Sequence, residues 1–249
     1  MAFRDDFDGP DLDRSVWLPH YLPAWSSRSA TAASHRLEGS CLVLDIPVEH
    51  PIWLEGEHEP PLRVSGVQSG SWSGPVGSTL GQQRFRDGQA VRTAEPRFEG
   101  WVPSSGHVEI RCRMMLSPRS MGALWLSGFE DDPAQEHCGE LCVVEVFGRS
   151  VRDGSCEVGV GIKSFRDPAL EQDFDAPRLA VDVSAFHTYA VDWDESEAVF
   201  SVDDAVVRRC PNPPTYPMQL MVAVFDFPEW SVGDDERLVP ELVVDHIAG

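Results

Sequence analysis

Short runs in which apolar and polar residues alternate, separated by Gly, Pro, Asp and Ser, recur along this sequence and constrain its fold more than any other feature. A period of two places successive side chains on opposite faces of an extended strand. Apolar residues recurring every three to four positions, as in an amphipathic helix, are hard to find. The pattern therefore predicts an all-β protein.

The clearest strand patterns are spread over most of the chain, and strands of this number suit a two-sheet antiparallel β-sandwich. Between Pro47 and Pro103 the strand signals are weak and Gly, Ser and Pro are frequent, so we expect elaborated loops there. Since no repeat or linker is present, we treat residues 1–249 as one domain. The expected strands are Cys41–Ile46, His107–Met115, Gly122–Ser127, Leu141–Phe147, Glu157–Phe165, His187–Trp193, Ala198–Val202, Met218–Phe225 and Leu242–Ile247.

The charge of the chain limits its partners. It carries 41 acidic against 20 basic residues, a formal net charge of -21, which repels phosphate backbones and anionic membrane surfaces. No apolar stretch approaches the roughly 20 residues that span a bilayer. We therefore expect neither a nucleic-acid nor a membrane partner.

The N-terminal segment and the cysteines indicate the cellular compartment in which the protein is expected. The opening MAFRDDFDGPDLD carries acidic residues and lacks the apolar stretch of a secretory signal. As written, the chain is expected in the cytoplasm, and a sequence trimmed of its signal would instead be secreted. Six cysteines in a chain of 249 residues do not suggest a disulfide framework, so we expect free thiols.

The segment Gly139–Phe147 places two carboxylates, Glu140 and Glu145, five positions apart in an otherwise apolar run. Side chains of a regular strand alternate, so an odd separation would send the two to opposite faces and bury one of them in the core. A carboxylate is a costly residue to bury without a partner. The spacing therefore needs a structural explanation.

A β-bulge at Val143–Val144 would supply that explanation. A bulge inserts one extra residue and restores the parity, which places Glu140, Cys142 and Glu145 on one face. Two neighbouring carboxylates on one face suit retaining glycoside hydrolysis, in which one is ionised as the nucleophile and the other holds a proton as the general acid. Two glutamates around a short apolar run also occur by chance, so the spacing alone is weak evidence.

Segments along nearly the whole chain share one resemblance. The segment Glu140–Glu145 resembles the Glu-x-Asp-x-x-Glu signature of glycoside hydrolase family 16, in its laminarinase-like branch, and Phe186–Trp193 resembles a later strand of that family closely. Similar segments occur at Phe3–Gly9, Ala123–Leu126, Phe200–Asp204 and Val243–Ile247.

The resemblance implies a concanavalin-like β-jelly roll and the endo-hydrolysis, with retention, of a β-1,3-linked or mixed-linkage glucan or a related polysaccharide. It implies Glu140 as the nucleophile and Glu145 as the acid/base. The partner would be a polysaccharide or oligosaccharide substrate, and no cofactor would be required. We expect the protein to act as a monomer.

Two positions depart from the family pattern. The family's assisting aspartate falls on Cys142, whose thiol is a weak donor and largely neutral at pH 7. Lys163, the only lysine of the chain, takes a place where relatives often have a histidine. A cation there would favour the ionised forms of both glutamates. These departures predict reduced or redirected activity.

Aromatic side chains and one cation are the candidates for substrate binding, because flat rings can stack on sugars. Trp125 is expected near the cleavage site, Trp230 and the loop residue Trp101 are expected as stacking platforms, and Lys163 is expected to face the cleft.

A structural calcium ion is a further expectation from the resemblance. In many relatives an ion ties the N-terminal entry to the last strand, and Asp6, the Gly9 carbonyl and Asp245 match those places. Oxygen ligands suit a hard cation. Ordinary surface charges are an equal alternative for these acids.

Three functions stay open at this stage. The two glutamates favour a hydrolase, whereas Cys142 and Lys163 favour a carbohydrate-binding protein that has lost turnover on the same fold. A transglycosylase would use the same carboxylates and differ in how well the cleft excludes water.

Overall fold

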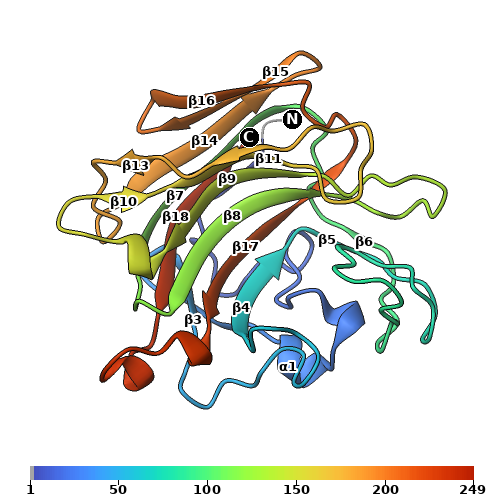
Figure 1. The fold of residues 1–249 in the computed structure, drawn as a ribbon, viewed down its shortest axis with the longest axis horizontal. Helices are drawn as coiled ribbons and strands as arrows, with labels where there is room; N and C mark the ends of the chain where they lie inside the picture. Colours follow the sequence, from blue (N-terminus) through green and yellow to red (C-terminus); the bar gives the residue numbers. More distant parts are fainter. Residues whose placement is uncertain (1–2) are drawn as a thin grey trace.

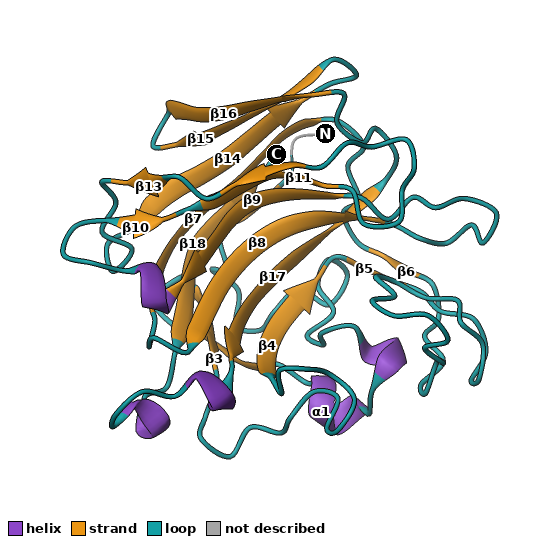
Figure 2. Cartoon of the chain, in the orientation of Figure 1, coloured by secondary structure: helices purple, strands orange, loops and turns teal. Residues whose placement is uncertain are grey.

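Two antiparallel β-sheets packed face to face form the body of the protein, which we describe from a computed structural model over residues 3–249. Figure 1 shows the long, curved strands of one sheet running beside those of the other. Helical segments are short and lie at the ends of strands or within loops (Figure 2). No helix within residues 3–249 is long and apolar enough to cross a membrane.

The larger sheet has eight strands in the order β16-β15-β14-β7-β18-β3-β2, with β1 beside β18. In β7 every second residue is buried, which is the pattern of a strand with one face on the core. The strands are β1 (Arg4–Asp5), β2 (Ser34–Leu37), β3 (Leu42–Asp45), β7 (Gly106–Met115), β14 (His187–Trp193), β15 (Glu197–Val202), β16 (Ala205–Pro211) and β18 (Glu241–Ala248).

The second sheet has six strands in the order β12-β11-β9-β8-β17-β4. In β8 and β17 every residue is buried, because one face meets the larger sheet and loops cover part of the other. The strands are β4 (Arg63–Gln68), β8 (Ser120–Gly128), β9 (Glu140–Phe147), β11 (Gly159–Lys163), β12 (Asp173–Asp175) and β17 (Met218–Asp226).

Small elements complete the fold. Two short pairs of strands, β5 with β6 and β10 with β13, stand apart from the main sheets. Their bounds, with those of the helices, are β5 (Gly70–Ser71), β6 (Phe98–Glu99), β10 (Cys156–Glu157), β13 (Arg178–Leu179), α1 (Arg28–Thr31) and the 3-10 helices η1 (Pro23–Trp25), η2 (Gly148–Ser150), η3 (Pro228–Trp230) and η4 (Asp235–Arg237).

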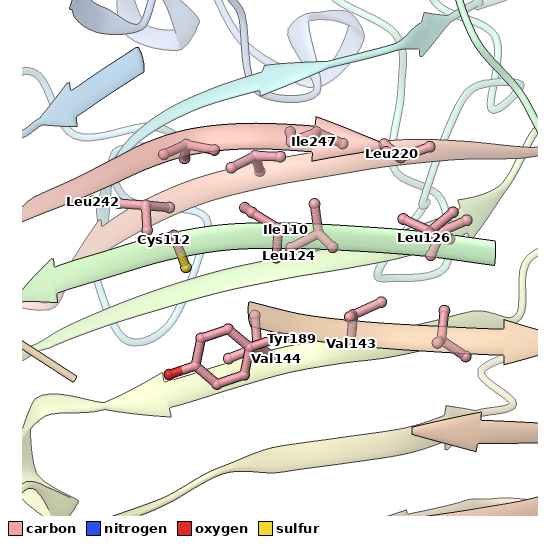
Figure 3. Close-up of a cluster of buried hydrophobic side chains, with 14 of the residues drawn as sticks. Ile110, Cys112, Leu124, Leu126, Val143, Val144, Tyr189, Leu220, Leu242 and Ile247 are labelled. Atoms are coloured by element: carbon pink, nitrogen blue, oxygen red, sulfur yellow. The ribbon is translucent and has the colours of Figure 1, made fainter. Parts of the chain in front are cut away.

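The main core fills the space between the two sheets. Figure 3 shows part of it, where Ile110 and Tyr189 of the larger sheet face Leu124 and Val144 of the second. These side chains are 0 to 1% exposed, and burial of this kind stabilises the fold by about 1.5 to 3 kcal/mol for each large apolar side chain.

A second apolar cluster lies on the opposite face of the six-stranded sheet. It joins Trp125 and Phe225, which belong to β8 and β17, to Trp25 of η1 and Trp53 of a loop. This cluster fixes the loops against the sheet and thereby shapes the cleft described below.

The all-β prediction is confirmed, and each of the nine expected segments overlaps a strand of one of the two main sheets. The segment Glu157–Phe165 differs, because Glu157 pairs with Arg178 in a separate small sheet while β11 begins at Gly159. The expectation of loops alone between Pro47 and Pro103 was wrong in part. That segment contains β4, whose Gly66 lies so close to β17 that a Cβ there would be 2.8 Å from the Ala223 Cβ.

All six cysteines are free, and five of them are buried. The expectation of free thiols is confirmed.

Candidate active site

The carboxylate strand β9 contains the expected bulge. Its register against β8 pairs Val144 with Leu124 and then Cys142 with Trp125, so Val143 has no partner. The extra residue changes the parity, and Glu140 and Glu145 both line one cleft. An apolar strand can therefore hold two carboxylates without burying either in the core between the sheets.

The cleft lies over the six-stranded sheet, on the face away from the larger sheet, and has a volume of about 280 Å³. Strands β8, β9, β11 and β17 form its floor, and loop residues complete its walls. The lining residues are Tyr21, Leu22, Trp53, His58, Leu62, Gln83, Phe85, Met121, Ala123, Trp125, Glu140, Cys142, Glu145, Lys163, Phe165, Phe225 and Phe227.

Small residues keep the floor beside Glu145 low. Glu145 is paired with Gly159 on one side and Ala123 on the other, and Ala123 is paired in turn with Ala223. A Cβ at Gly159 would lie 2.7 Å from the Phe174 ring and 3.1 Å from the Glu145 Cβ. A larger residue at Gly159 would displace the carboxylate or close the cleft.

Glu140 is the more deeply buried of the two acids, with 5% of its surface exposed. Its Oε1 accepts a hydrogen bond from the Gln83 side chain. Burial raises the pKa of Glu140 to about 8, while the positive charge of Lys163 opposes that rise and the negative charge of Glu145 adds to it.

Glu145 is held by an ion pair. The Lys163 Nζ donates to its Oε2 at 2.8 Å, and the same ammonium lies 4.5 Å from the centre of the Phe174 ring. The pair is only partly exposed, so water screens it less than a surface pair. Lys163 therefore holds the Glu145 carboxylate in a fixed place in the cleft.

Cys142 lies between the two acids as a neutral thiol. Burial raises its pKa well above the usual value, and its Sγ donates to the Gly159 carbonyl at 3.6 Å. A thiol in this state offers neither acid a negative charge. At rest the proton is thus favoured on Glu140, which is opposite to the distribution that the resemblance implies for the first step of hydrolysis.

The expected substrate-binding residues separate into two groups. Trp125 and Lys163 line the cleft. Trp230 lies beside it, because its ring stacks on that of Phe227, with centroids 4.1 Å apart, and Phe227 lines the cleft.

Trp101 lies elsewhere, and its expected place in the cleft needs correction. Its ring stacks on Phe3, with centroids 4.2 Å apart, and packs against the main core. The residue follows β6 and covers the region where the two ends of the chain meet, since a Cβ at Gly249 would be 2.4 Å from the ring. Structural packing accounts for this tryptophan.

Several lining residues come from segments in which the sequence showed no site. Tyr21, Gln83 and Phe85 lie in loops, and no motif marks them. Trp53 was noticeable only as a tryptophan in a Gly-rich and Ser-rich segment.

The residues expected to bind calcium are engaged in ion pairs. Asp6 accepts from the Arg4 Nε at 2.9 Å, and the Asp245 Oδ2 lies 3.0 Å from the Arg111 Nη1. Within residues 3–249, no group of three or more His, Cys, Asp or Glu side chains is arranged to hold a metal ion. The carboxylates of Asp6 and Asp245 are thus each paired with a guanidinium group, and calcium binding at Asp6, Gly9 and Asp245 stays a prediction.

Comparisons with known proteins agree with this geometry. The sequence model of the family described as "Glycosyl hydrolases family 16" matches residues 103–237, which include both acids and Lys163. A comparison with curated protein sequences gave no match.

Solved structures similar to this chain include three glycan-cleaving proteins. A GlcNAcα1-4Gal-releasing endo-β-galactosidase from Clostridium perfringens is 23% identical, with a TM-score of 0.80. The match covers 99% of this chain and 60% of the endo-β-galactosidase chain. The laminarinase catalytic domain from Thermotoga petrophila is 16% identical, with a TM-score of 0.67, and the match covers 99% of this chain and 95% of the laminarinase domain. A lichenase from a mouse hindgut metagenome is 15% identical, with a TM-score of 0.63, and the match covers 99% of this chain and 97% of the lichenase chain. The chain thus spans less than two thirds of the first of these proteins, and at these identities the similarity shows the fold.

Proposed function

Because the chain belongs to glycosyl hydrolase family 16, we propose that its cleft cleaves internal linkages of a β-linked polysaccharide with retention of configuration. The observation that carries the proposal is the pair of glutamates brought to one cleft by the bulge in β9. Glu140 is the nucleophile and Glu145 the acid/base.

The first step forms a covalent intermediate. The Glu140 carboxylate attacks the anomeric carbon, the bond from that carbon to the leaving oxygen breaks, and Glu145 gives its proton to that oxygen. In the second step Glu145 takes a proton from a water molecule, whose oxygen attacks the anomeric carbon and releases Glu140 as a carboxylate. The sugar keeps its configuration because it undergoes two displacements.

The resting protonation of the site limits its rate. The first step needs the proton on Glu145 and none on Glu140. Burial raises the pKa of Glu140 and so favours a proton on the nucleophile, which is the opposite of what this step needs. The reactive arrangement is therefore a minor one, and the activity is lower than a site with an aspartate at position 142 would give.

The proposed substrate is a β-1,3-linked or mixed-linkage glucan. A galactose-containing chain is a second candidate, and the observation that favours it is the higher TM-score of the endo-β-galactosidase, 0.80 against 0.67 for the laminarinase domain. Incubation with a panel of β-glucans and galactans, with reducing ends measured, separates the two candidates.

The control for that experiment is Glu140→Gln, which keeps the size of the side chain and cannot act as a nucleophile. Reducing ends from the wild-type protein and none from the variant support hydrolysis. Binding of oligosaccharide by both proteins without new reducing ends would support a binding protein, for which Cys142 and Lys163 are the evidence. Longer products in place of new reducing ends would indicate a transglycosylase.

A further inference from the structure

Gln83 contacts the proposed nucleophile from a loop remote in sequence. It lies between β5 and β6, and its Nε2 donates a hydrogen bond to the Glu140 Oε1. Its backbone has a φ of 48°, in the left-handed region that residues other than glycine seldom adopt. Such a conformation persists only where the surroundings hold it.

Bonds to the preceding residue, Gln82, hold the loop in place. The Trp25 Nε1 donates to the Gln82 carbonyl at 2.7 Å. The Gln82 Oε1 accepts from the Glu130 backbone N–H at 3.2 Å and from the Gln219 Nε2 at 3.0 Å. Gln82 thereby connects the loop to β17 and to the segment after β8.

Glu130 and Arg166 brace Gln83 from the other side. The Gln83 backbone donates a hydrogen bond to the Glu130 carboxylate, and the Arg166 Nη2 lies 3.1 Å from both oxygens of that carboxylate. Arg166 also donates to the carbonyl of Arg84, the next residue along the loop. The Gln83 amide is therefore fixed in position before any substrate arrives.

We propose that Gln83 is the positioning residue for Glu140, and that it supplies the support which the neutral thiol of Cys142 cannot give. The inference rests on the proposed function, since it concerns the nucleophile of that mechanism. Its physical basis is that a donor to a carboxylate favours the ionised form and fixes the direction of the reacting oxygen.

The balance of charges around Glu140 makes this donor important. Burial alone favours the protonated acid, and the Gln83 amide is one of two groups that oppose it, the other being Lys163. The titratable groups that face Glu140 from the elements around it are Glu145 and Cys142 of β9, Lys163 of β11, Glu130, Tyr21 and His58.

The test is a pair of substitutions of nearly equal volume. Gln83→Met removes the donor, so the acidic limb of the pH profile of kcat/KM should move up by about one pH unit. The value of kcat should fall about tenfold or more, with KM little changed. Gln83→Glu replaces the donor with a like charge, and its limb should move further in the same direction.

The matched control is Gln89→Met in the same loop. Gln89 is buried, whereas Gln83 is partly exposed, and the Gln89 Oε1 accepts from the Phe85 backbone N–H, but Gln89 is not a partner of Glu140. Its pH profile should match that of the wild type. If the acidic limb of the Gln83→Met profile lies at the same pH as in the wild type, the inference is overturned.

A second measurement keeps the inference separate from the proposed function. The pKa of Glu140 can be followed by carboxyl carbon NMR in the folded protein without any substrate. A higher Glu140 pKa in Gln83→Met than in the wild type supports the positioning role even if no substrate is turned over, in which case the proposed function alone fails. Turnover with an unchanged Glu140 pKa refutes the positioning role alone.

Discussion

The two sides of the cleft are built on one sheet and differ in chemistry. On the side of β9 and β11 lie Glu140, Glu145 and Lys163, whereas the side of β8 and β17 presents Met121 and Phe225. We call these the polar side and the apolar side. On the polar side each charge is held by a specific partner, and on the apolar side packing against the loops fixes the shape. Changes on the polar side should therefore alter the chemistry, and changes on the apolar side should alter folding and binding.

The largest effect is expected on the polar side. Glu145→Gln removes the proton donor for the leaving oxygen, so kcat/KM should fall about 10²- to 10⁴-fold with the fold intact by circular dichroism. A fall that is equally large with an activated aryl glycoside, whose leaving group needs no proton, would argue against the acid role.

On the apolar side the expected effect is on stability. Phe225 is 5% exposed and packs in the cluster with Trp125 and Phe227. Phe225→Ala should lower the free energy of unfolding by about 3 to 5 kcal/mol, measured by denaturant titration. If Phe225→Ala instead unfolds like the wild type and loses only turnover, the distinction between the two sides does not hold.

Glu140 belongs to the polar side but should also affect stability, because its burial makes the carboxylate costly to ionise. Its pKa is raised from 4.5 to about 8 on folding, so ionisation of Glu140 costs more in the folded protein than in the unfolded chain. The contribution of Glu140 to the free energy of unfolding is therefore fully present below pH 4.5 and is lost as the pH rises toward 8. Glu140→Gln should therefore stabilise the protein by about 3 kcal/mol at pH 7 and very little at pH 4. Equal shifts in Tm at both pH values would mean that Glu140 is not the group that resists ionisation.

The smallest effect is expected at Cys142, where the polar side departs from the family signature. Cys142→Asp supplies a negative charge between the two acids, and hydrolysis should rise about tenfold. Since the position is 1% exposed, an added carboxylate should also cost stability, about 1 to 3 kcal/mol. A variant that folds, binds oligosaccharide and gains no turnover would show that Cys142 does not limit the reaction.

The strands of the fold and the carboxylate pair could be predicted because both depend on local pattern. Alternation identified β7 and β14, and the parity of Glu140 and Glu145 required a bulge that the register shows at Val143. β4 was missed because its sequence, RVSGVQ, contains a glycine that only close contact with β17 explains.

The rest of the site depends on tertiary contacts that no local pattern encodes. Gln83 reaches Glu140 across 57 positions of sequence, from a loop held by residues of several other elements. Trp101 and Trp53 are alike as loop tryptophans in the sequence, yet only Trp53 lines the cleft. The resting protonation of Glu140 follows from its burial, which the sequence does not reveal.

The measurement that tests the account most directly is covalent trapping of the nucleophile. A 2-deoxy-2-fluoro glycoside of the cleaved oligosaccharide slows the second displacement, so the glycosyl ester accumulates and its site can be read by peptide mass spectrometry. The account predicts a label on Glu140, and none when Glu140→Gln is treated in the same way. A label on Glu145, or hydrolysis of the natural substrate with inversion and no label, would contradict it.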